Sequence, residues 1–386
     1  VYVNAVSVGA GTVTLSQPLY DAAGSQVFTF TRFRYVLDFS GFTQLDKLNL
    51  SDLELQCNGV GSAIMLPPAG NNFHVRDCYV TRPKDRGITS IGRGCQDLHV
   101  DRCQFLSNEQ SLRAQDRLSI ALNVNANDAK LRDNRIVRFR HFAVMAGSSH
   151  LVVGNHWFQG DSETLGVRLA GLVLTETNVN TTITGNYIDN NFIEWTNEYE
   201  ADPDFGIQHS FGGLTITGNV FMATDVAPWF RWIVIKPYGT GHFVDGLTIS
   251  NNVFKSINGS VDRVETVDTS FAGFDYLRMK NIWVEGNMFT AVTQATANPV
   301  VVQHSQATAA AVWTITPGAF LPFGGWSRNV EAVVAGGAIT NAAGQRQSDM
   351  PYALVTQGAS KQDVTVNWAA ACKGQISVKV RMDNPY

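Results

Sequence analysis

Two neighbouring segments of the chain, residues 192–213 and 225–243, concentrate acidic, basic and aromatic side chains. Flat indole and phenol rings pack against the apolar C–H faces of sugars and leave a polar edge free for hydrogen bonds. Arginine and lysine side chains bind carboxylate or sulfate groups. We therefore predict a glycan-binding surface with the side chains of Glu194, Trp195, Tyr199, Trp229, Arg231, Trp232, Lys236 and Tyr238. The alternative is that the tryptophans pack between loops and the acids only solvate a long loop.

Three acids of the first segment are the candidate catalytic residues, namely Glu194, Asp202 and Asp204. Glycoside hydrolysis uses two carboxyl groups about 5 to 9.5 Å apart, and this loop could supply them. A lyase would instead need a base such as Lys236 or His209. Because long surface loops are often acidic without any catalytic role, we expect binding without cleavage ahead of cleavage by a hydrolase or lyase.

Composition excludes several classes of protein. The 386 residues are 44% hydrophobic and only 16% charged, and 29 basic against 33 acidic residues give a net charge of −4. A disordered chain or a coiled coil carries more charge, and nucleic-acid binding needs a basic patch. No apolar run reaches the ~18 residues of a membrane span, so we expect neither membrane insertion nor a nucleic-acid partner. Five cysteines without a CxxC pair, and histidines without ligand spacing, predict no metal site and no cofactor.

Nine short peptides repeat between residues 48 and 289 and must position the two segments described above. Their central column reads Leu53, Cys78, Cys103, Asn134, Asn155, Asn186, Asn219, Asn252 and Asn287. The apolar column three residues earlier reads Leu50, Val75, Val100, Leu131, Val152, Ile183, Ile216, Ile249 and Val284. The apolar column two residues later reads Leu55, Val80, Phe105, Ile136, Trp157, Ile188, Phe221, Phe254 and Phe289. Such regular columns indicate a solenoid in which each repeat is one coil.

Successive repeats are 21 to 35 residues apart, which is short for a propeller blade of about 40 residues. We predict an all-β protein, a right-handed parallel β-helix with about three short strands in each coil. Equivalent residues of successive coils stack about 4.8 Å apart, so an Asn in a left-handed turn can bond to the Asn above and below it. By the same stacking, Glu194–Trp195 and Arg231–Trp232 would be neighbours on one outward face. Cys78 and Cys103 would be close enough for a disulfide or would form two buried thiols.

The repeat divides the chain into three parts. Residues 1–45 lead into the helix, residues 46–298 form the β-helix, and residues 299–386 form a C-terminal β module in which the Asn column stops and hairpin-like spacing begins. We expect this module to cover the open end of the helix, an edge that is otherwise prone to aggregate. Because the chain starts at Val1 without a leader, we expect it to be either a processed chain or, in preference, the back part of a longer protein.

Four stretches of the chain resemble a known family: LSQPLYDAAGSQVFTFTRFRY, KDRGITSIG, TGNYIDNNFIEWTNE and DVAPWFRWIVIKPYGTGHF. They are similar to a pectate-lyase-like β-helix family whose members are labelled family 28-related glycosyl hydrolases and accompany gene transfer agents and phages. The NTD, DD and GHG motifs of family 28 polygalacturonases do not occur in this sequence. The tripeptide of this sequence that is most similar to the GHG motif is Gly241-His242-Phe243. The tripeptide that matches the R-x-K motif of the same family is Arg278-Met279-Lys280. The resemblance therefore implies the fold and not the activity.

The resemblance also implies a biological setting, which is the surface of a phage-like particle outside the cell. It implies a homotrimeric spike, on a gene transfer agent head or a phage tail, that binds cell-surface or capsular polysaccharide for attachment. Other proteins of the particle would contact the spike through a region that precedes Val1. Two other interpretations stay open: a polysaccharide depolymerase acting on the same glycan, and an assembly protein whose outer faces serve only subunit contact.

Overall fold

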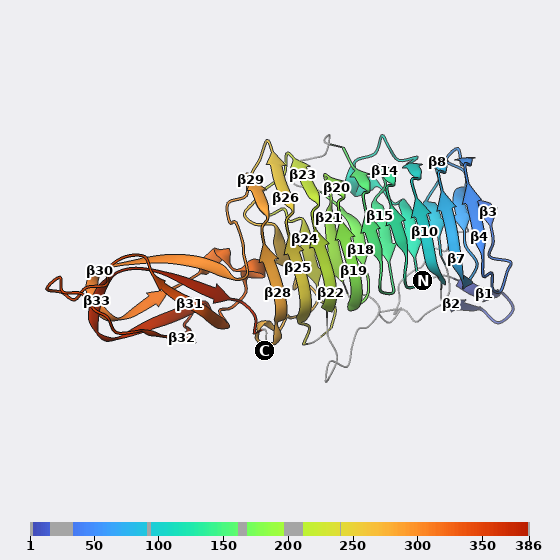
Figure 1. Ribbon diagram of the computed structural model, residues 1–386. Helices are drawn as coiled ribbons and strands as arrows, with labels where there is room; N and C mark the ends of the chain where they lie inside the picture. Colours follow the sequence, from blue (N-terminus) through green and yellow to red (C-terminus); the bar gives the residue numbers. More distant parts are fainter. Residues whose placement is uncertain are drawn as a thin grey trace.

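The computed structural model describes residues 3–15, 34–90, 94–160, 168–196, 211–239 and 241–384. Nearly all of its ordered elements are β-strands, and most of them stack into a long column from which a smaller sheet projects at one end (Figure 1). The column consists of three parallel sheets of nine strands each. The short 3₁₀ helices in this part of the chain are η1 Ala114–Asp116, η2 Tyr276–Arg278, η3 Gly318–Phe320 and η4 Pro322–Gly324.

The three sheets of the column are here named sheets I, II and III. Sheet I contains β4 Leu48–Ser51, β7 Ala69–Arg76, β10 Gly94–Asp101, β13 Lys130–Arg132, β16 Leu151–Val153, β19 Asn178–Thr184, β22 Phe211–Thr217, β25 Val244–Ser250 and β28 Lys280–Glu285. Sheet II contains β5 Glu54–Gln56, β8 Tyr79–Thr81, β11 Gln104–Leu106, β14 Arg135–Val137, β17 His156–Phe158, β20 Tyr187–Asp189, β23 Val220–Thr224, β26 Val253–Ile257 and β29 Met288–Thr290. Sheet III contains β3 Tyr35–Asp38, β6 Ser62–Met65, β9 Arg86–Thr89, β12 Ile120–Val124, β15 His141–Met145, β18 Ala170–Leu174, β21 Phe192–Thr196, β24 Ile233–Lys236 and β27 Glu265–Val267.

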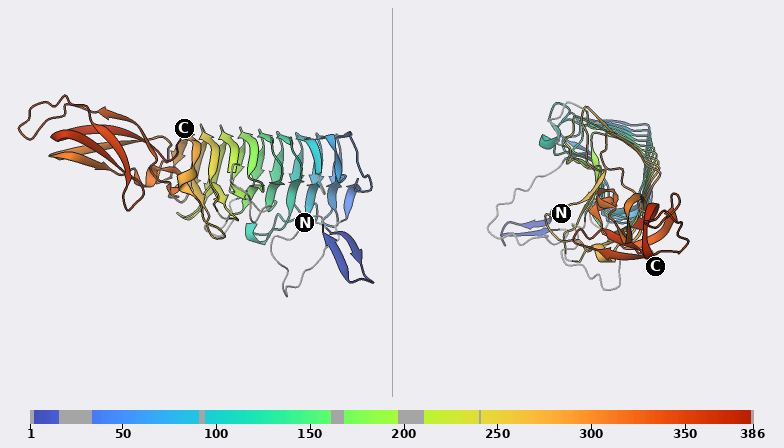
Figure 2. Two further views of the ribbon diagram at one scale, coloured as in Figure 1. Left: turned by 90° about the horizontal axis from the view of Figure 1, so that it is seen from below. Right: turned by 90° about the vertical axis from the view of Figure 1, so that its left-hand side faces the viewer.

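The chain passes through sheets I, II and III in turn and then returns to sheet I one rung further along the column. Each coil therefore holds three short strands, and every strand pairs in parallel with its equivalents on the adjacent coils. In the view along the column, successive coils lie over one another (Figure 2). The predicted fold, an all-β right-handed parallel β-helix, is confirmed.

Both apolar columns of the repeat are interior stacks. The strand pairing of sheet I places its predicted column in register from Leu50 to Val284 without a slip. The pairing of sheet II does the same from Leu55 to Phe289. Most members are fully buried, and burying one such side chain contributes about 1.5–3 kcal/mol. The aliphatic and aromatic stacks therefore supply the stability of the column.

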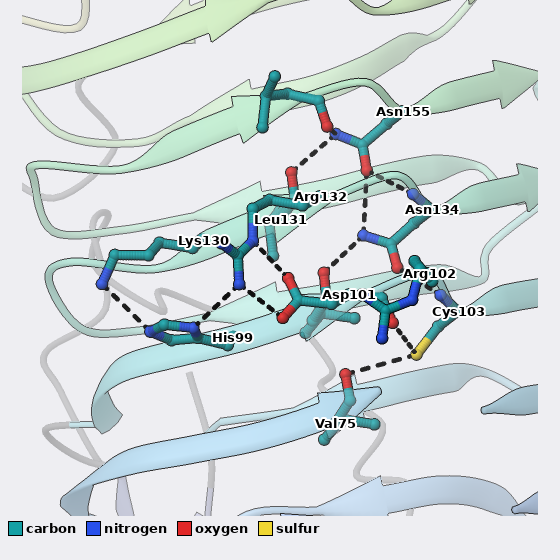
Figure 3. A network of polar contacts seen from close by, with 12 residues as sticks. Val75, His99, Asp101, Arg102, Cys103, Lys130, Leu131, Arg132, Asn134 and Asn155 are labelled. Carbon is teal, nitrogen blue, oxygen red and sulfur yellow. Dashed lines mark hydrogen bonds and ion pairs between the residues drawn. The ribbon is translucent and has the colours of Figure 1, made fainter. Parts of the chain in front are cut away.

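The turn between sheets I and II contains the predicted asparagine ladder. Asn219 Nδ2 donates to Asn252 Oδ1 at 3.0 Å, and Asn219 Oδ1 accepts from Asn186 Nδ2 at 2.9 Å. Figure 3 shows the same bond between Asn134 and Asn155. The sequence predicts a left-handed backbone at the asparagine itself, but the structure has it one residue earlier, as at Gly218 with a φ of 64°. The bend falls there because the asparagine must keep its side chain buried between the rungs.

Replacing Asn219 by leucine is expected to lower the free energy of unfolding by about 3–5 kcal/mol, measured by urea denaturation. The change removes five hydrogen bonds of the Asn219 side chain, and the partners of those bonds stay buried. Asn287→Leu, at the end of the ladder, is the matched control because it removes three bonds. A smaller loss for Asn219→Leu than for Asn287→Leu would contradict the ladder as a source of stability.

The N-terminal part of the chain begins with an antiparallel hairpin of β1 Val3–Ser7 and β2 Thr12–Leu15, which lies beside the column (Figure 2). The first strand of the helix is β3, within the segment 1–45 that leads into the coils. All five cysteines are buried and free. Cys78 and Cys103 stand on adjacent rungs as two thiols, and Cys103 Sγ lies 3.5 Å from the carbonyl oxygen of Val75. Of the two alternatives for this pair, the buried thiols hold.

The C-terminal module is an antiparallel sheet of four strands, β30 Val300–Ile315, β31 Asn329–Ala335, β32 Tyr352–Gln357 and β33 Asp363–Arg381. β33 pairs with all three of the others, and the sheet projects away from the last coil (Figure 1). Contact with that coil is made by short segments on either side of the strands. Asp383 accepts from the backbone N–H of Ile282 at 2.9 Å and pairs with Arg381 at 2.8 Å.

Glu265 on β27, the last strand of sheet III, forms a second contact between the column and the module. Its side chain is fully buried, and its carboxylate accepts from the backbone N–H of Phe323 at 3.1 Å and from the hydroxyl of Thr296 at 2.9 Å. Burial raises the pKa of Glu265 from the ordinary 4.5 to about 7, although Arg263 and Arg231 oppose the shift. Glu265 therefore holds its proton up to a higher pH in the folded protein than in the unfolded chain.

Glu265 is expected to contribute about 3 kcal/mol of stability at low pH that is lost between about pH 5 and pH 8, whereas His141, His150 and His242, whose pKa values are lowered by burial, change the stability in the opposite direction. A carboxyl whose folded pKa is raised binds its proton more tightly in the folded state, so the contribution is lost as the pH rises through the folded pKa. Glu265→Gln mimics the protonated form and should change the pH dependence of the unfolding temperature, so that the temperature falls less, or rises more, with increasing pH than in the wild type. Glu285→Gln, on the exposed side of β28, is the control and should leave it unchanged. Equal slopes in wild type and Glu265→Gln would rule out this origin.

Candidate functional site

The outward face of sheet III carries the candidate site. Side chains alternate between the two faces of a strand, and on β21 Ile193 and Trp195 point into the coil while Glu194 points outward. The register places Glu194 beside Val173 on one adjacent rung and Val234 on the other. Val234 is in turn beside Thr266 of β27. The two segments therefore lie on adjacent rungs, but the register places Glu194 opposite Val234 and not opposite Arg231, and the two predicted pairs do not share one outward face.

Two of the predicted glycan-binding residues are buried, and the prediction that they point outward is wrong. Trp195 is 1% exposed, packs edge-on against Phe211 and donates from Nε1 to the carbonyl of Glu176 at 2.8 Å. Trp232 is fully buried and packs against Phe230 and Phe254. Glu194 and Trp195 are consecutive strand residues, so they cannot share a face. Both indoles belong to the core and cannot touch a ligand at the surface.

A cleft of about 570 Å³ opens where β21, β24 and β27 meet the loop before β24. Trp229 is 63% exposed and presents its indole on the wall of the cleft. The lining residues are Arg168, Phe192, Glu194, Trp229, Phe230, Arg231, Val234, Thr266, Val267, Asp268, Thr269 and Ser270. The cleft thus combines one accessible aromatic face with charged and hydroxyl groups, which is a composition that suits a polyhydroxylated ligand.

Two guanidinium groups are fixed in the wall of the cleft. Arg231 donates to the carbonyls of Pro228 and Phe230, both at 2.7 Å, and lies 3.5 Å from the Asp262 carboxylate. Burial lowers the pKa of Arg231 from its ordinary value. Arg168 is 7% exposed and donates to Asn190 Oδ1 at 3.2 Å. These contacts hold both side chains in one geometry at the wall of the cleft.

The remaining predicted site residues fall outside this cleft. Lys236 and Tyr238 lie at and just beyond the end of β24, and the Lys236 ammonium is 5.6 Å from the centre of the Tyr238 ring. Tyr199, Asp202, Asp204 and His209 belong to residues 197–210, which lie outside the described residues. Of the predicted glycan-binding residues that the structure describes, Trp195 and Trp232 are in the core. The others are Glu194, Trp229 and Arg231 in the cleft, with Lys236 and Tyr238 beyond it.

Sequence reasoning missed Arg168 and Asp268, which line the cleft from neighbouring coils. Asp268 follows β27 directly, and β27 is in register with β24. The alternation of residues 192–196 indicates that Glu194 points outward, since it lies between the two large apolar residues Ile193 and Trp195. The sequence does not predict that Arg168 lies at the cleft, because sheet III has no repeated column from which the register of its strands could be read.

Sheet I carries a second polar cluster on its outer face, which Figure 3 shows together with the asparagine ladder. Arg132 binds Asp101 through two hydrogen bonds of 2.7 Å, and Lys130 lies 3.1 Å from His99 Nε2. Lys130 also pairs with Asp97. These acids and bases satisfy one another, and exposed pairs of this kind contribute about 0–1 kcal/mol each. The cluster is a charge ladder that follows from the stacking of the rungs.

Among the described residues, no group of three or more His, Cys, Asp and Glu side chains is arranged to hold a metal ion. The helices in the described ranges are also too short to cross a membrane.

Comparisons with known proteins return likenesses in structure alone. No model of a protein family matches the sequence, and a search of characterised proteins found no similar sequence. A double mutant of the tailspike protein of E. coli bacteriophage HK620, in complex with a pentasaccharide, is 13% identical over 91% of this chain and 71% of its own, with a TM-score of 0.42. A single mutant of that tailspike, also with a pentasaccharide, is 12% identical over 91% and 72%, with a TM-score of 0.39. A deletion mutant in complex with a hexasaccharide is 12% identical over 83% and 66%, with a TM-score of 0.36. At TM-scores this low, the description of the fold rests on the strand pairing of this chain itself.

Proposed function

We propose that this chain is a spike on the surface of a virus-like particle, of a phage or a gene transfer agent, and that it attaches to polysaccharide of a recipient cell. The observation that carries the proposal is the cleft on the outer face of sheet III, with the exposed indole of Trp229 beside fixed guanidinium and carboxylate groups. An indole face covers the C–H face of a sugar ring, and the charged groups bond to its hydroxyls. The particle setting comes from the family resemblance of the sequence.

The column explains why such a cleft suits attachment. Its rungs are held by backbone pairing on every coil, so the cleft walls on β21, β24 and β27 are rigid before a ligand arrives. A preformed site loses little conformational entropy on binding. Repetition also gives the column length without enlarging its cross-section, and the cleft lies on the last three strands of sheet III, towards the end of the column from which the C-terminal module projects (Figure 1).

Replacing Trp229 by alanine is expected to weaken binding to the recognised polysaccharide about tenfold or more, because the cleft loses its exposed ring. The experiment first screens the purified chain against a panel of bacterial capsular and other surface polysaccharides by biolayer interferometry. Phe42→Ala removes an exposed aromatic side chain near the first coil, away from the cleft and from the C-terminal module, and is the matched control. Unfolding temperatures should be the same for all three proteins. No binding by the wild type, or equal affinity for Trp229→Ala, would contradict the proposed site.

Cleavage of the glycan is the second candidate function, and one observation favours it. Two carboxylates, those of Glu194 and Asp268, line the same cleft, and glycosidases use a pair of carboxyl groups. The polysaccharide recovered from the binding experiment decides between the two functions. Unchanged chain length and no new reducing ends agree with attachment alone, whereas shortened chains would make the protein a depolymerase. Binding to no member of the panel would favour a purely structural protein of the particle.

We also propose that the spike is a homotrimer and that the C-terminal module contributes to its subunit contact. Large apolar side chains are exposed on this module, namely Val301, Val312, Val334, Met350, Tyr352 and Leu354. Apolar side chains that gather on a surface mark protein interfaces, and Val312 and Tyr352 lie on one row of the sheet because both pair with Asn367 of β33. The number of three copies comes from the family resemblance of the sequence.

Light scattering of the purified chain is expected to give three times 42.2 kDa. Val334→Lys should shift the mass toward that of the monomer, because it puts a charge into the apolar surface of the module. Val8→Lys, at a position that is 90% exposed on the N-terminal hairpin, is the control and should leave the mass unchanged. A monomeric wild type would contradict the proposal.

A further inference from the structure

A stacked pair of aromatic rings lies just beyond the cleft. β24 and β27 are in register through Val234 with Thr266 and Ile235 with Val267. The residues that follow these two strands bring Tyr238 and Phe271 together, with their ring centres 4.6 Å apart and their planes at 15°. Phe271 is 63% exposed. The pair therefore presents a flat aromatic face to solvent instead of closing a core.

A lysine accompanies this pair. Lys236 is the last residue of β24, and its ammonium lies 5.0 Å from the centre of the Phe271 ring and 5.6 Å from that of Tyr238. A cation at this distance is attracted by the ring faces, so the ammonium is held next to them. An aromatic surface with a charged donor at its side is the arrangement that the cleft shows at Trp229 and Arg231.

The aromatic pair is continuous with the cleft. Asp268, Thr269 and Ser270 line the cleft, and Phe271 is the next residue of the same loop. Trp229 lies before β24 and Tyr238 after it, so the accessible rings stand at opposite ends of that strand. The step from Ile233 to Lys236 alone covers about 10 Å of extended chain. A ligand that reaches both aromatic surfaces must therefore be longer than a single sugar ring.

We propose that Phe271, Tyr238 and Lys236 form a second subsite, which stacks a further sugar of the same polysaccharide chain that the cleft holds at Trp229. The inference rests on the proposed function and makes it more specific. The ligand is a stretch of several sugars that lies along β24, and the affinity depends on its length.

The test compares Phe271→Ala with Trp229→Ala on fragments of the polysaccharide that the wild type captures from the panel. Phe271→Ala is expected to weaken binding of long fragments about five- to tenfold and to leave binding of mono- and disaccharide fragments unchanged. Trp229→Ala should weaken binding of both. Phe271→Tyr keeps a ring and should restore the affinity for long fragments. Phe320→Ala removes another exposed phenylalanine, in η3, and is the matched control.

The outcomes separate the second subsite from the proposed function. If Trp229→Ala weakens binding and Phe271→Ala binds long fragments like the wild type, the second subsite is wrong and the cleft stands. If the wild type binds no polysaccharide of the panel, or if neither variant changes the affinity, the cleft and the second subsite are both wrong. A loss for Phe271→Ala that is equal for short and long fragments would also contradict a separate subsite.

Discussion

Register between adjacent coils is the constraint on which the rest of this structure depends. Parallel strands pair rung by rung, and a slip by one residue would turn every inward side chain to the outside. The asparagine ladder opposes such a slip, because each amide bonds to the amide of the next rung and to a backbone carbonyl. Apolar columns on both sides add the energy of burial. Position along the strand therefore decides which side chains enter the core and which become available for function.

That constraint explains the division between the core and the cleft on sheet III. Trp195 and Glu194 differ by one strand position, so one lies in the core and the other on the cleft wall. The indole most accessible to a ligand belongs to Trp229, which precedes β24 and is free of the alternation. Side chains that can contact a ligand are therefore found where the chain leaves a strand, or at strand positions whose polar side chains point outward. The polar cluster on sheet I obeys the same rule, but its charges are paired with one another.

The sequence predicts the parts of the structure that repeat with it. Sheets I and II could be aligned residue by residue, since the ladder asparagine stands at a constant distance from the apolar positions on both sides. Sheet III could not, because segments of different length separate its strands from sheet II, and no column survives that variation. The cleft lies on sheet III. The sequence predicts Glu194 and Arg231 for the site because their segments are rich in aromatic and charged residues, but it does not predict Arg168 and Asp268, which only the register of sheet III brings there. The orientation of Trp195 was nevertheless readable from the alternation of residues 192–196.

The last coil shows what happens where the repeat stops. Its inner face would be open to water, and the structure closes it with short segments of the C-terminal module instead of another rung. Those segments do not pair with the strands of the coils, so they are held by buried side-chain contacts. The two acids in these contacts differ in whether a basic side chain is bonded to them. Asp383 is neutralised by Arg381 at 2.8 Å, whereas Glu265 bonds only to an amide and a hydroxyl among its hydrogen-bond partners. Burial without a bonded basic partner disfavours the charged form of a carboxyl group and so favours its protonated form. Proton binding by Glu265 and structural order are therefore coupled at the attachment of the module, whereas the asparagine ladder and the apolar columns that keep the coils in register contain no group that titrates.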